Sequence, residues 1–321
     1  MSLRKKLRWF PFVLALVAVP LLVVACAGGE EKVENTPGVS DSEIKIGTLL
    51  PLSQSAAAAR GIPLSEGMRA YFDYYINDKG GIYGRKINFI VGDSQYTGPV
   101  ASEAVRKLVE QDQVFAIQGT LGTDAESAVY QYLEEKGVPD MYLLTGESRF
   151  TDPVARNRFG FLVDYTDEGR ILGKYIAEEF DGKKLGIIAQ NDDFGKEGEQ
   201  GLKQGIKENG AHLETVTEYY DVTQNDITSQ VQRLKSDNVH VIGFYGMPAQ
   251  AASLFKTARQ SLNWDVPVVI SGTDAVEIVG ALAGYENIQG AVSVVLGHQA
   301  FETDVPGVAK HHEIMAKYAP V

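Results

Sequence analysis

The chain of 321 residues contains one cysteine, Cys26, and far fewer basic than acidic residues. A single cysteine cannot form a disulfide within the chain, so the fold must be stabilised by an ordinary apolar core. The 30 Lys and Arg residues against 42 Asp and Glu residues give a formal net charge of -12 at pH 7. A surface of this sign repels nucleic acids and anionic lipids, which argues against both as partners.

Sequence motifs of common enzymes are missing as well. The first predicted strand is not followed by Gly-x-Gly-x-x-Gly, and the chain has neither a phosphate-loop lysine followed by Ser or Thr nor a Gly-x-Ser-x-Gly elbow. His311, His312 and Glu313 are not continued by a histidine at the spacing of zinc proteases. We therefore expect a binding protein without catalytic residues, cofactor or metal. A hydrolase or dehydrogenase is a less favoured alternative.

The first 26 residues have the order of a secretory signal peptide: a basic cluster, an apolar run from Trp9 and a small residue, Ala25, before the cut. A transmembrane anchor fits less well, because a spanning helix needs about 20 apolar residues and prolines interrupt this run. The end of the run, residues 23–26, resembles the lipobox of bacterial lipoproteins. That resemblance implies a lipid on Cys26 and an extracytoplasmic location, in the periplasm or at the outer cell surface.

Residues 27–42 are small, charged and without apolar periodicity, which predicts a flexible tether. From residue 43 onward, strands and helices alternate. The predicted strands cover residues 44–50, 86–91, 114–118, 138–144, 185–190, 213–220, 239–244, 266–270 and 291–296. The predicted helices cover residues 64–76, 101–109, 124–135, 167–180, 196–208, 226–236, 248–261 and 275–283. Apolar strands separated by amphipathic helices predict an α/β fold with two doubly wound parallel-sheet lobes joined by a hinge.

Ligands of open parallel sheets bind outside the carboxyl ends of the strands. The loops at those ends are rich in hydroxyl groups and glycine and carry few charges, which suits a small polar ligand. Turns favour the same residues for conformational reasons alone. The loops in question are residues 53–55, 119–123, 145–148, 191–195, 245–247 and 271–274.

Several blocks of sequence resemble the type I periplasmic binding proteins of ABC importers, nearest to the branched-chain amino acid (leucine/isoleucine/valine) group. They are residues 44–47, 80–87, 104–109, 137–139, 190–195, 229–231 and 234–235. The resemblance implies lobe 1 from residues 43–163 plus 297–321 and lobe 2 from residues 164–296. Family members usually continue for some tens of residues beyond the helix that ends near Tyr318, which implies a truncated C-terminus here.

The same resemblance implies ligand-binding residues in lobe 1. Thr123 falls where a hydroxyl meets the ligand carboxylate, and Thr145 and Gly146 fall in the segment that completes this contact. Arg60 lies where it could face an anionic ligand. Alternative interpretations remain open: Thr123 could be a helix N-cap, and Arg60 a solvated loop residue.

In lobe 2 the resemblance implies an aromatic lid at Phe194 and a further wall formed by Tyr245 and Met247. Asp274 matches the acidic residue that pairs with the α-ammonium group of an amino acid. Phe194 could instead be plain core, and Asp274 could cap the helix that follows it.

The expected function is capture of a small solute by hinge closure and its delivery to a membrane permease with its ATPase. A branched-chain or other hydrophobic amino acid is the first choice of solute. Amides, ureas and aromatic acids are the alternatives, and a ligand-sensing receptor lobe is the competing class of protein.

Overall fold

The computed structural model describes residues 36–274 and 276–319. Cys26 and the predicted signal peptide lie outside these residues, as does most of the tether. The described chain contains two five-stranded sheets, and every strand pair within them is parallel. This confirms the predicted α/β fold with two parallel-sheet lobes.

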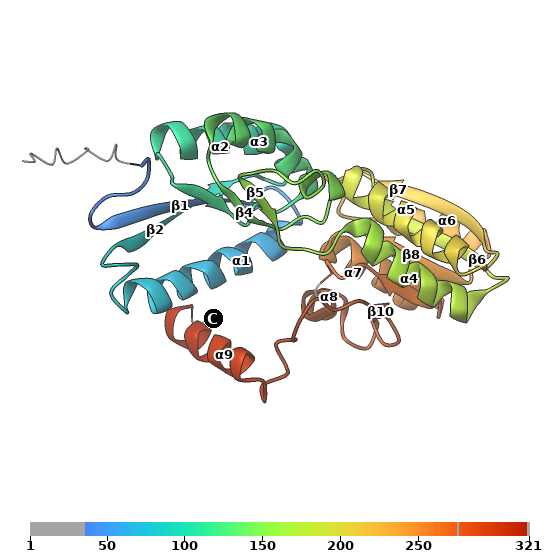
Figure 1. The fold of residues 1–321 in the computed structure, drawn as a ribbon. Coiled ribbons are helices and arrows are strands. Elements are labelled where there is room, and N and C mark those ends of the chain that lie inside the picture. Colours follow the sequence, from blue (N-terminus) through green and yellow to red (C-terminus); the bar gives the residue numbers. More distant parts are fainter. Residues whose placement is uncertain (1–35, 275, 320–321) are drawn as a thin grey trace, which may run out of the picture. The chain divides into compact units, whose positions relative to one another are not determined.

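The first sheet has the strand order β2-β1-β3-β4-β5. Its strands are β1 (Glu43–Leu50), β2 (Lys86–Asp93), β3 (Ala116–Gln118), β4 (Asp140–Leu143) and β5 (Arg158–Gly160). The helical elements of this part are α1 (Ala58–Tyr71), η1 (Phe72–Asn77), α2 (Gly98–Arg106), η2 (Lys107–Gln111), α3 (Thr123–Lys136) and η3 (Ser148–Phe150), together with α9 (Pro306–Tyr318). Figure 1 shows α2 and α3 on one face of the sheet and α1 on the other, where α9 packs against it. We call this unit lobe 1.

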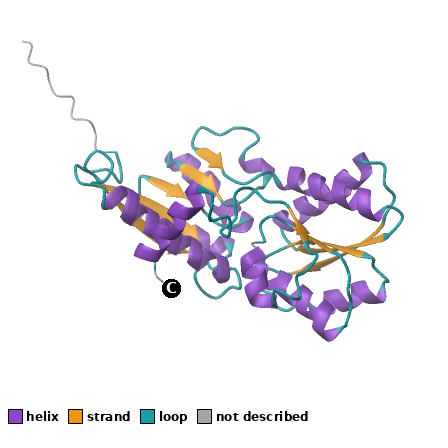
Figure 2. Ribbon diagram, turned by 90° about the horizontal axis from the view of Figure 1, so that it is seen from below, coloured by secondary structure: helices purple, strands orange, loops and turns teal. Residues whose placement is uncertain are grey.

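The second sheet has the order β10-β9-β8-β6-β7. Its strands are β6 (Lys184–Gln190), β7 (Glu214–Tyr220), β8 (Val241–Tyr245), β9 (Val268–Ile270) and β10 (Val292–Ser293). Its helical elements are α4 (Tyr165–Phe180), α5 (Asp193–Glu208), α6 (Thr228–Ser236), α7 (Pro248–Lys256), η4 (Thr257–Ser261) and α8 (Val276–Ala283). Figure 2 shows its strands between two layers of helices. We call this unit lobe 2.

Each sheet is buried on both faces, as its strands of continuous apolar residues predict. In lobe 2, α4 and α5 cover a cluster that contains Leu172, Ile187 and Leu202. A second cluster on the other face brings Ile188, Val231 and other apolar residues under α6, α7 and α8. Lobe 1 has a cluster of its own, which contains Leu49, Val105 and Leu133, so the main cores of the two lobes are separate.

Several elements differ from the sequence-based expectation. Strand β10 covers only Val292–Ser293 of the predicted residues 291–296. Helix α1 begins at Ala58 instead of residue 64, because the alanines that precede Arg60 have high helix propensity. Strand β5 was not predicted. Its three residues leave Phe159 exposed at the edge of the sheet, and such a short segment gives no periodic signal.

Candidate functional site

The carboxyl ends of the two sheets carry the loops that meet between the lobes. A cavity of about 20 Å³ lies there, a volume that holds about one water molecule. Residues of both lobes line it: Arg60, Tyr96, Leu121, Gly122, Leu144, Leu162, Tyr165, Phe194, Met247 and Thr273. Three of the predicted ligand residues, Arg60, Phe194 and Met247, are among them.

Thr123 and Thr145 come together in lobe 1, next to this cavity. Their hydroxyl oxygens lie 2.8 Å apart, and each residue is 2 % exposed. Thr123 is the first residue of α3, and Gly122 holds the cap position with φ +108°, a backbone conformation that favours glycine. The Thr123 hydroxyl therefore does not serve as the N-cap; its partner is the Thr145 hydroxyl.

Gly146 packs against the backbone of the segment that leads from lobe 1 into lobe 2. A Cβ atom on Gly146 would lie 2.1 Å from the carbonyl oxygen of Val163. The carbonyl of Gly146 accepts a hydrogen bond of 2.8 Å from the backbone N–H of Tyr165. Glycine is required here because the crossing segment passes too close for a side chain.

Phe194 packs in the core of lobe 2 and also faces the cavity. Its ring lies 4.7 Å from the ring of Tyr165 and 6.0 Å from that of Tyr245. Tyr245 is fully buried behind Phe194 and is not among the cavity's lining residues. Phe194 thus belongs to the core of lobe 2 and also lines the cavity, while Tyr245 packs behind it.

Asp274 is the most unusual of the predicted residues. It is 2 % exposed, and neither carboxylate oxygen has a hydrogen-bond donor within the described chain. Burial raises the pKa of Asp274 well above its usual range, the charge of Arg60 opposes this rise, and the charge of Glu168 adds to it. A buried carboxylate without a donor is costly. Its chain neighbour Thr273 lines the cavity.

Glu168 is a buried acid that no sequence motif singles out. It lies in the first turn of α4, is 1 % exposed and accepts a hydrogen bond of 3.0 Å from the N–H of Gly272. Burial raises the pKa of Glu168, although hydrogen bonds from Ser271 and Gly272 lower it in part. Glu168 therefore ties the loop that carries Asp274 to α4.

Tyr96 is a second residue missed from the sequence. It follows β2, and its ring lines the cavity from lobe 1. The rule that ligands bind at the carboxyl ends of strands applies to the loop after β2 as well. Extending the rule to every strand would have found it.

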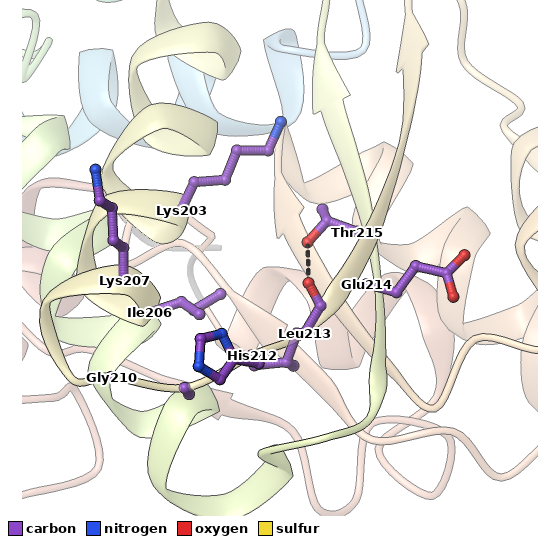
Figure 3. Close-up of a pocket in the computed structure, with 9 residues that line it drawn as sticks. Lys203, Ile206, Lys207, Gly210, His212, Leu213, Glu214 and Thr215 are labelled. Atoms are coloured by element: carbon purple, nitrogen blue, oxygen red, sulfur yellow. Dashed lines mark hydrogen bonds between the residues drawn. The ribbon is translucent and has the colours of Figure 1, made fainter.

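Larger hollows lie outside this site. One of about 450 Å³ lies on lobe 2 near the C-terminus of α5 and the start of β7. Figure 3 shows Lys203 and Lys207 extending from one side of it and Glu214 from the other. Lys203 is paired with Glu199 at 2.5 Å, and Glu214 with Lys184 at 2.8 Å. The charges of Lys203 and Glu214 are thus directed at other residues and do not converge on the hollow.

The described residues offer no cluster of three or more His, Cys, Asp or Glu side chains placed to bind a metal. Within residues 36–274 and 276–319, none of the helices has the length and apolarity needed to span a membrane. The polar groups of the candidate site are thus hydroxyls, carboxylates and one guanidinium. These groups suit the binding of a small polar solute.

Two parallel-sheet lobes with facing loops define the class of two-lobed solute-binding proteins. A family model described as "Periplasmic binding protein" matches residues 43–321, and the chain belongs to this family. The family description is that of a binding protein, which agrees with the expectation that the chain is not an enzyme.

Individual relatives are distant. The chain is 24% identical over 219 residues to Leu/Ile/Val-binding protein homolog 1 of Brucella abortus (strain 2308), an alignment that covers 68% of this chain and 58% of that relative. It resembles a solved fatty acid ABC transporter substrate-binding protein from Thermomonospora curvata with a TM-score of 0.79 and 25% identity, covering 89% of this chain and 72% of that one. A branched chain amino acid ABC transporter protein from Thermus thermophilus with bound valine gives a TM-score of 0.77 and 19% identity, covering 88% and 72%.

Proposed function

We propose that the chain is the extracytoplasmic solute-binding protein of an ABC importer, anchored by a lipid on Cys26. It captures an amino acid with an apolar side chain between its lobes and delivers it to a permease and its ATPase. The names of the Brucella and Thermus relatives support this choice of solute.

The buried carboxylate of Asp274, which has no donor within the described chain, is the observation that carries the proposal. An α-ammonium group would supply the missing donors and the opposite charge. In lobe 1, next to the lining residues Gly122 and Leu144, the hydroxyls of Thr123 and Thr145 lie at the N-terminus of α3, where N–H groups and the helix dipole favour a carboxylate. The solute's apolar side chain would contact Phe194 and Met247.

Capture requires opening of the lobes, because a cavity of about 20 Å³ cannot admit an amino acid. A solute that contacts both lobes favours the closed arrangement by its differential affinity for that arrangement. Hinge closure is therefore the proposed mechanism.

A thermal-shift screen of the protein against a panel of small solutes tests the proposal first. A solute at 100 times its dissociation constant should add about 2.7 kcal/mol to the free energy of unfolding. Calorimetric titration of Asp274→Ala with the best amino acid should then show a loss of affinity of roughly 30-fold to several thousand-fold, because truncating one partner of a buried charge pair costs about 2 to 5 kcal/mol. Undiminished binding of that amino acid to Asp274→Asn would overturn the pairing with the ammonium group.

Arg60 supports a second candidate, an apolar carboxylic acid. Its side chain lines the cavity, and no carboxylate within the described chain lies within salt-bridge distance of it. The Thermomonospora relative is named for fatty acids, and aromatic acids have the same charge. For such a solute, Arg60→Ala should abolish binding and Asp274→Asn should improve it, the reverse of the pattern expected for an amino acid.

A further inference from the structure

Tyr96 extends from lobe 1 to residues of lobe 2, and the backbone of its loop has an unusual conformation. Gln95 and Tyr96 have φ angles of 49° and 61°, in the left-handed region that residues other than glycine seldom adopt. The Asp93 carboxylate accepts the N–H of Gln95 at 3.0 Å, and the Ser94 hydroxyl accepts that of Tyr96 at 3.3 Å. Such conformations persist where surrounding contacts fix them, and they are concentrated at functional sites.

The Tyr96 hydroxyl completes a ring of hydrogen bonds whose other members all belong to lobe 2. It donates to the Met247 sulfur at 3.3 Å and accepts from Gln190 Nε2 at 3.3 Å. The Tyr220 hydroxyl closes the ring, because it donates to Gln190 Oε1 at 3.3 Å and accepts the N–H of Met247 at 3.1 Å. We call Gln190, Tyr220 and Met247 the socket.

The socket and the tyrosine are buried together. Tyr96 is 6 % exposed, Met247 5 %, and both Gln190 and Tyr220 1 %. The Tyr96 ring also packs against Gly122, where a Cβ atom would lie 2.7 Å from Cε2 of the ring. Since every hydrogen-bond partner of the hydroxyl lies in lobe 2, separating the lobes breaks these bonds and exposes the ring to water.

We propose that Tyr96 is a positioning residue for solute capture: docked in the socket of Gln190, Tyr220 and Met247, it holds the two lobes closed whatever solute lies between them. These bonds form between two parts of the protein, so they stabilise the closed arrangement even without a solute. It sets the fraction of closed protein before any solute binds, and hence the apparent affinity for every solute. This inference does not depend on the identity of the solute.

The test compares Tyr96→Phe and Tyr96→Ala with the wild type, all as full chains and with no solute added. Tyr132→Phe is the matched control: it removes a tyrosine hydroxyl whose bond of 3.1 Å to Glu110 stays within lobe 1. Hydrogen exchange is measured in the lobe 2 segments 188–192 and 244–247, and small-angle scattering gives the radius of gyration.

Tyr96→Phe should speed exchange in both lobe 2 segments about 5- to 10-fold, the effect of losing roughly one net hydrogen bond. Tyr96→Ala should speed it more and should increase the radius of gyration, while Tyr132→Phe should change neither. If Tyr96→Ala fails to fold, Tyr96→Phe decides alone. Faster exchange confined to the lobe 1 loop around residue 96, with lobe 2 unchanged, would overturn the proposal, because a merely local structural role predicts that result. A failed solute screen would leave this outcome unaffected.

Discussion

The hydroxyl oxygens of Thr123 and Thr145 lie 2.8 Å apart, although 22 positions separate the two residues in the chain. Each hydroxyl has one proton, so whichever residue donates to the other, the partner's proton is directed at a further acceptor. The Tyr165 hydroxyl, which hydrogen-bonds to both threonine side chains, is the neighbour within reach. The pair is buried at the N-terminus of α3, beside the cavity between the lobes. The proposed function assigns this pair to the carboxylate of the solute.

The first prediction tests that assignment. Thr123→Val keeps the shape of the side chain and removes the hydroxyl, whereas Thr123→Ser keeps the hydroxyl and serves as the control. A hydrogen bond to a charged group contributes about 1.5 to 3 kcal/mol, so the valine variant should bind the best screening solute about 10- to 140-fold more weakly by calorimetric titration. Equal affinity of the valine variant and the wild type would exclude Thr123 from the site.

The second prediction concerns pH and the carboxyl pair of Glu147 and Glu197. The N–H of Ser148 lies 3.3 Å from each oxygen of Glu197, which brings the loop after β4 against α5. Burial, the hydrogen bond with Glu197 and the charge of Glu197 raise the pKa of Glu147 to about 8, from an ordinary value of 4.5. Between these two pH values the native protein holds a proton that the unfolded chain has lost, so stability falls as the pH rises from about 4.5 to 8.

Glu147→Gln removes this titration. Its melting temperature should be similar to that of the wild type near pH 5 and higher at pH 8.5, because the amide needs no proton to stay neutral. Glu179→Gln on an exposed position of α4 makes the same chemical change in solvent and serves as the control. A difference between Glu147→Gln and the wild type that stays constant from pH 5 to 8.5 would contradict the shifted pKa.

The third prediction concerns the close approach of α4 and α5. A Cβ atom on Gly201 would lie 2.6 Å from the carbonyl oxygen of Thr166 and 2.9 Å from the Cα of Gly169. Both neighbours are backbone atoms, so Gly201→Ala can be accommodated only by moving the helices apart. Overpacking of this kind typically costs about 1 to 3 kcal/mol, which denaturant unfolding would measure.

Gly67 in α1 provides the matched control, because a Cβ atom there would meet nothing within 4 Å. Gly67→Ala should stabilise the protein by about 0.4 to 1 kcal/mol through the lower entropy of the unfolded chain. The two glycines therefore predict opposite signs for the same substitution. Stabilisation by Gly201→Ala would show that the helix contact is looser than described.

The fourth prediction tests the proposed anchor. Cys26→Ser removes the only sulfur in the chain that could carry the lipid. The variant should move from the membrane fraction to the soluble fraction of cells fed a labelled fatty acid, and it should lose the label. The wild type must be labelled and sediment with membranes in the same experiment. Wild-type protein that is soluble and unlabelled would refute the lipoprotein proposal.

Much of the fold could be predicted from the chain because its signals are local. The apolar runs of β1, β6 and β8 and the amphipathic helices between them indicate parallel sheets directly. The predicted parallel lobes are confirmed, whereas the start of α1 and the existence of β5 were not foreseen. Very short strands such as β5 form because a neighbouring strand, here β4, supplies the hydrogen bonds, and no local pattern records that pairing.

The candidate site divides in the same way. The sequence pattern predicted hydroxyl groups and Asp274 at the carboxyl ends of strands. This is possible because strand order and direction fix where the carboxyl edge of a parallel sheet lies. The pattern could not show that Thr123 bonds to Thr145 or that Asp274 is buried without a donor. Nor could it show that Tyr96 of lobe 1 bonds to Gln190 and Met247 of lobe 2. Tyr96 and Met247 are separated by 151 positions, and no periodicity extends over such a distance.

The sequence by itself therefore determined the two-lobed α/β architecture and the loops in which a ligand site would lie, because both follow from the local alternation of apolar strands and amphipathic helices. Tertiary structure alone decided which side chains from those loops meet, which carboxylates are buried and which residue of one lobe docks in the other. The physical reason is that burial and pairing depend on contacts between distant segments, and these exist only once both sheets are packed.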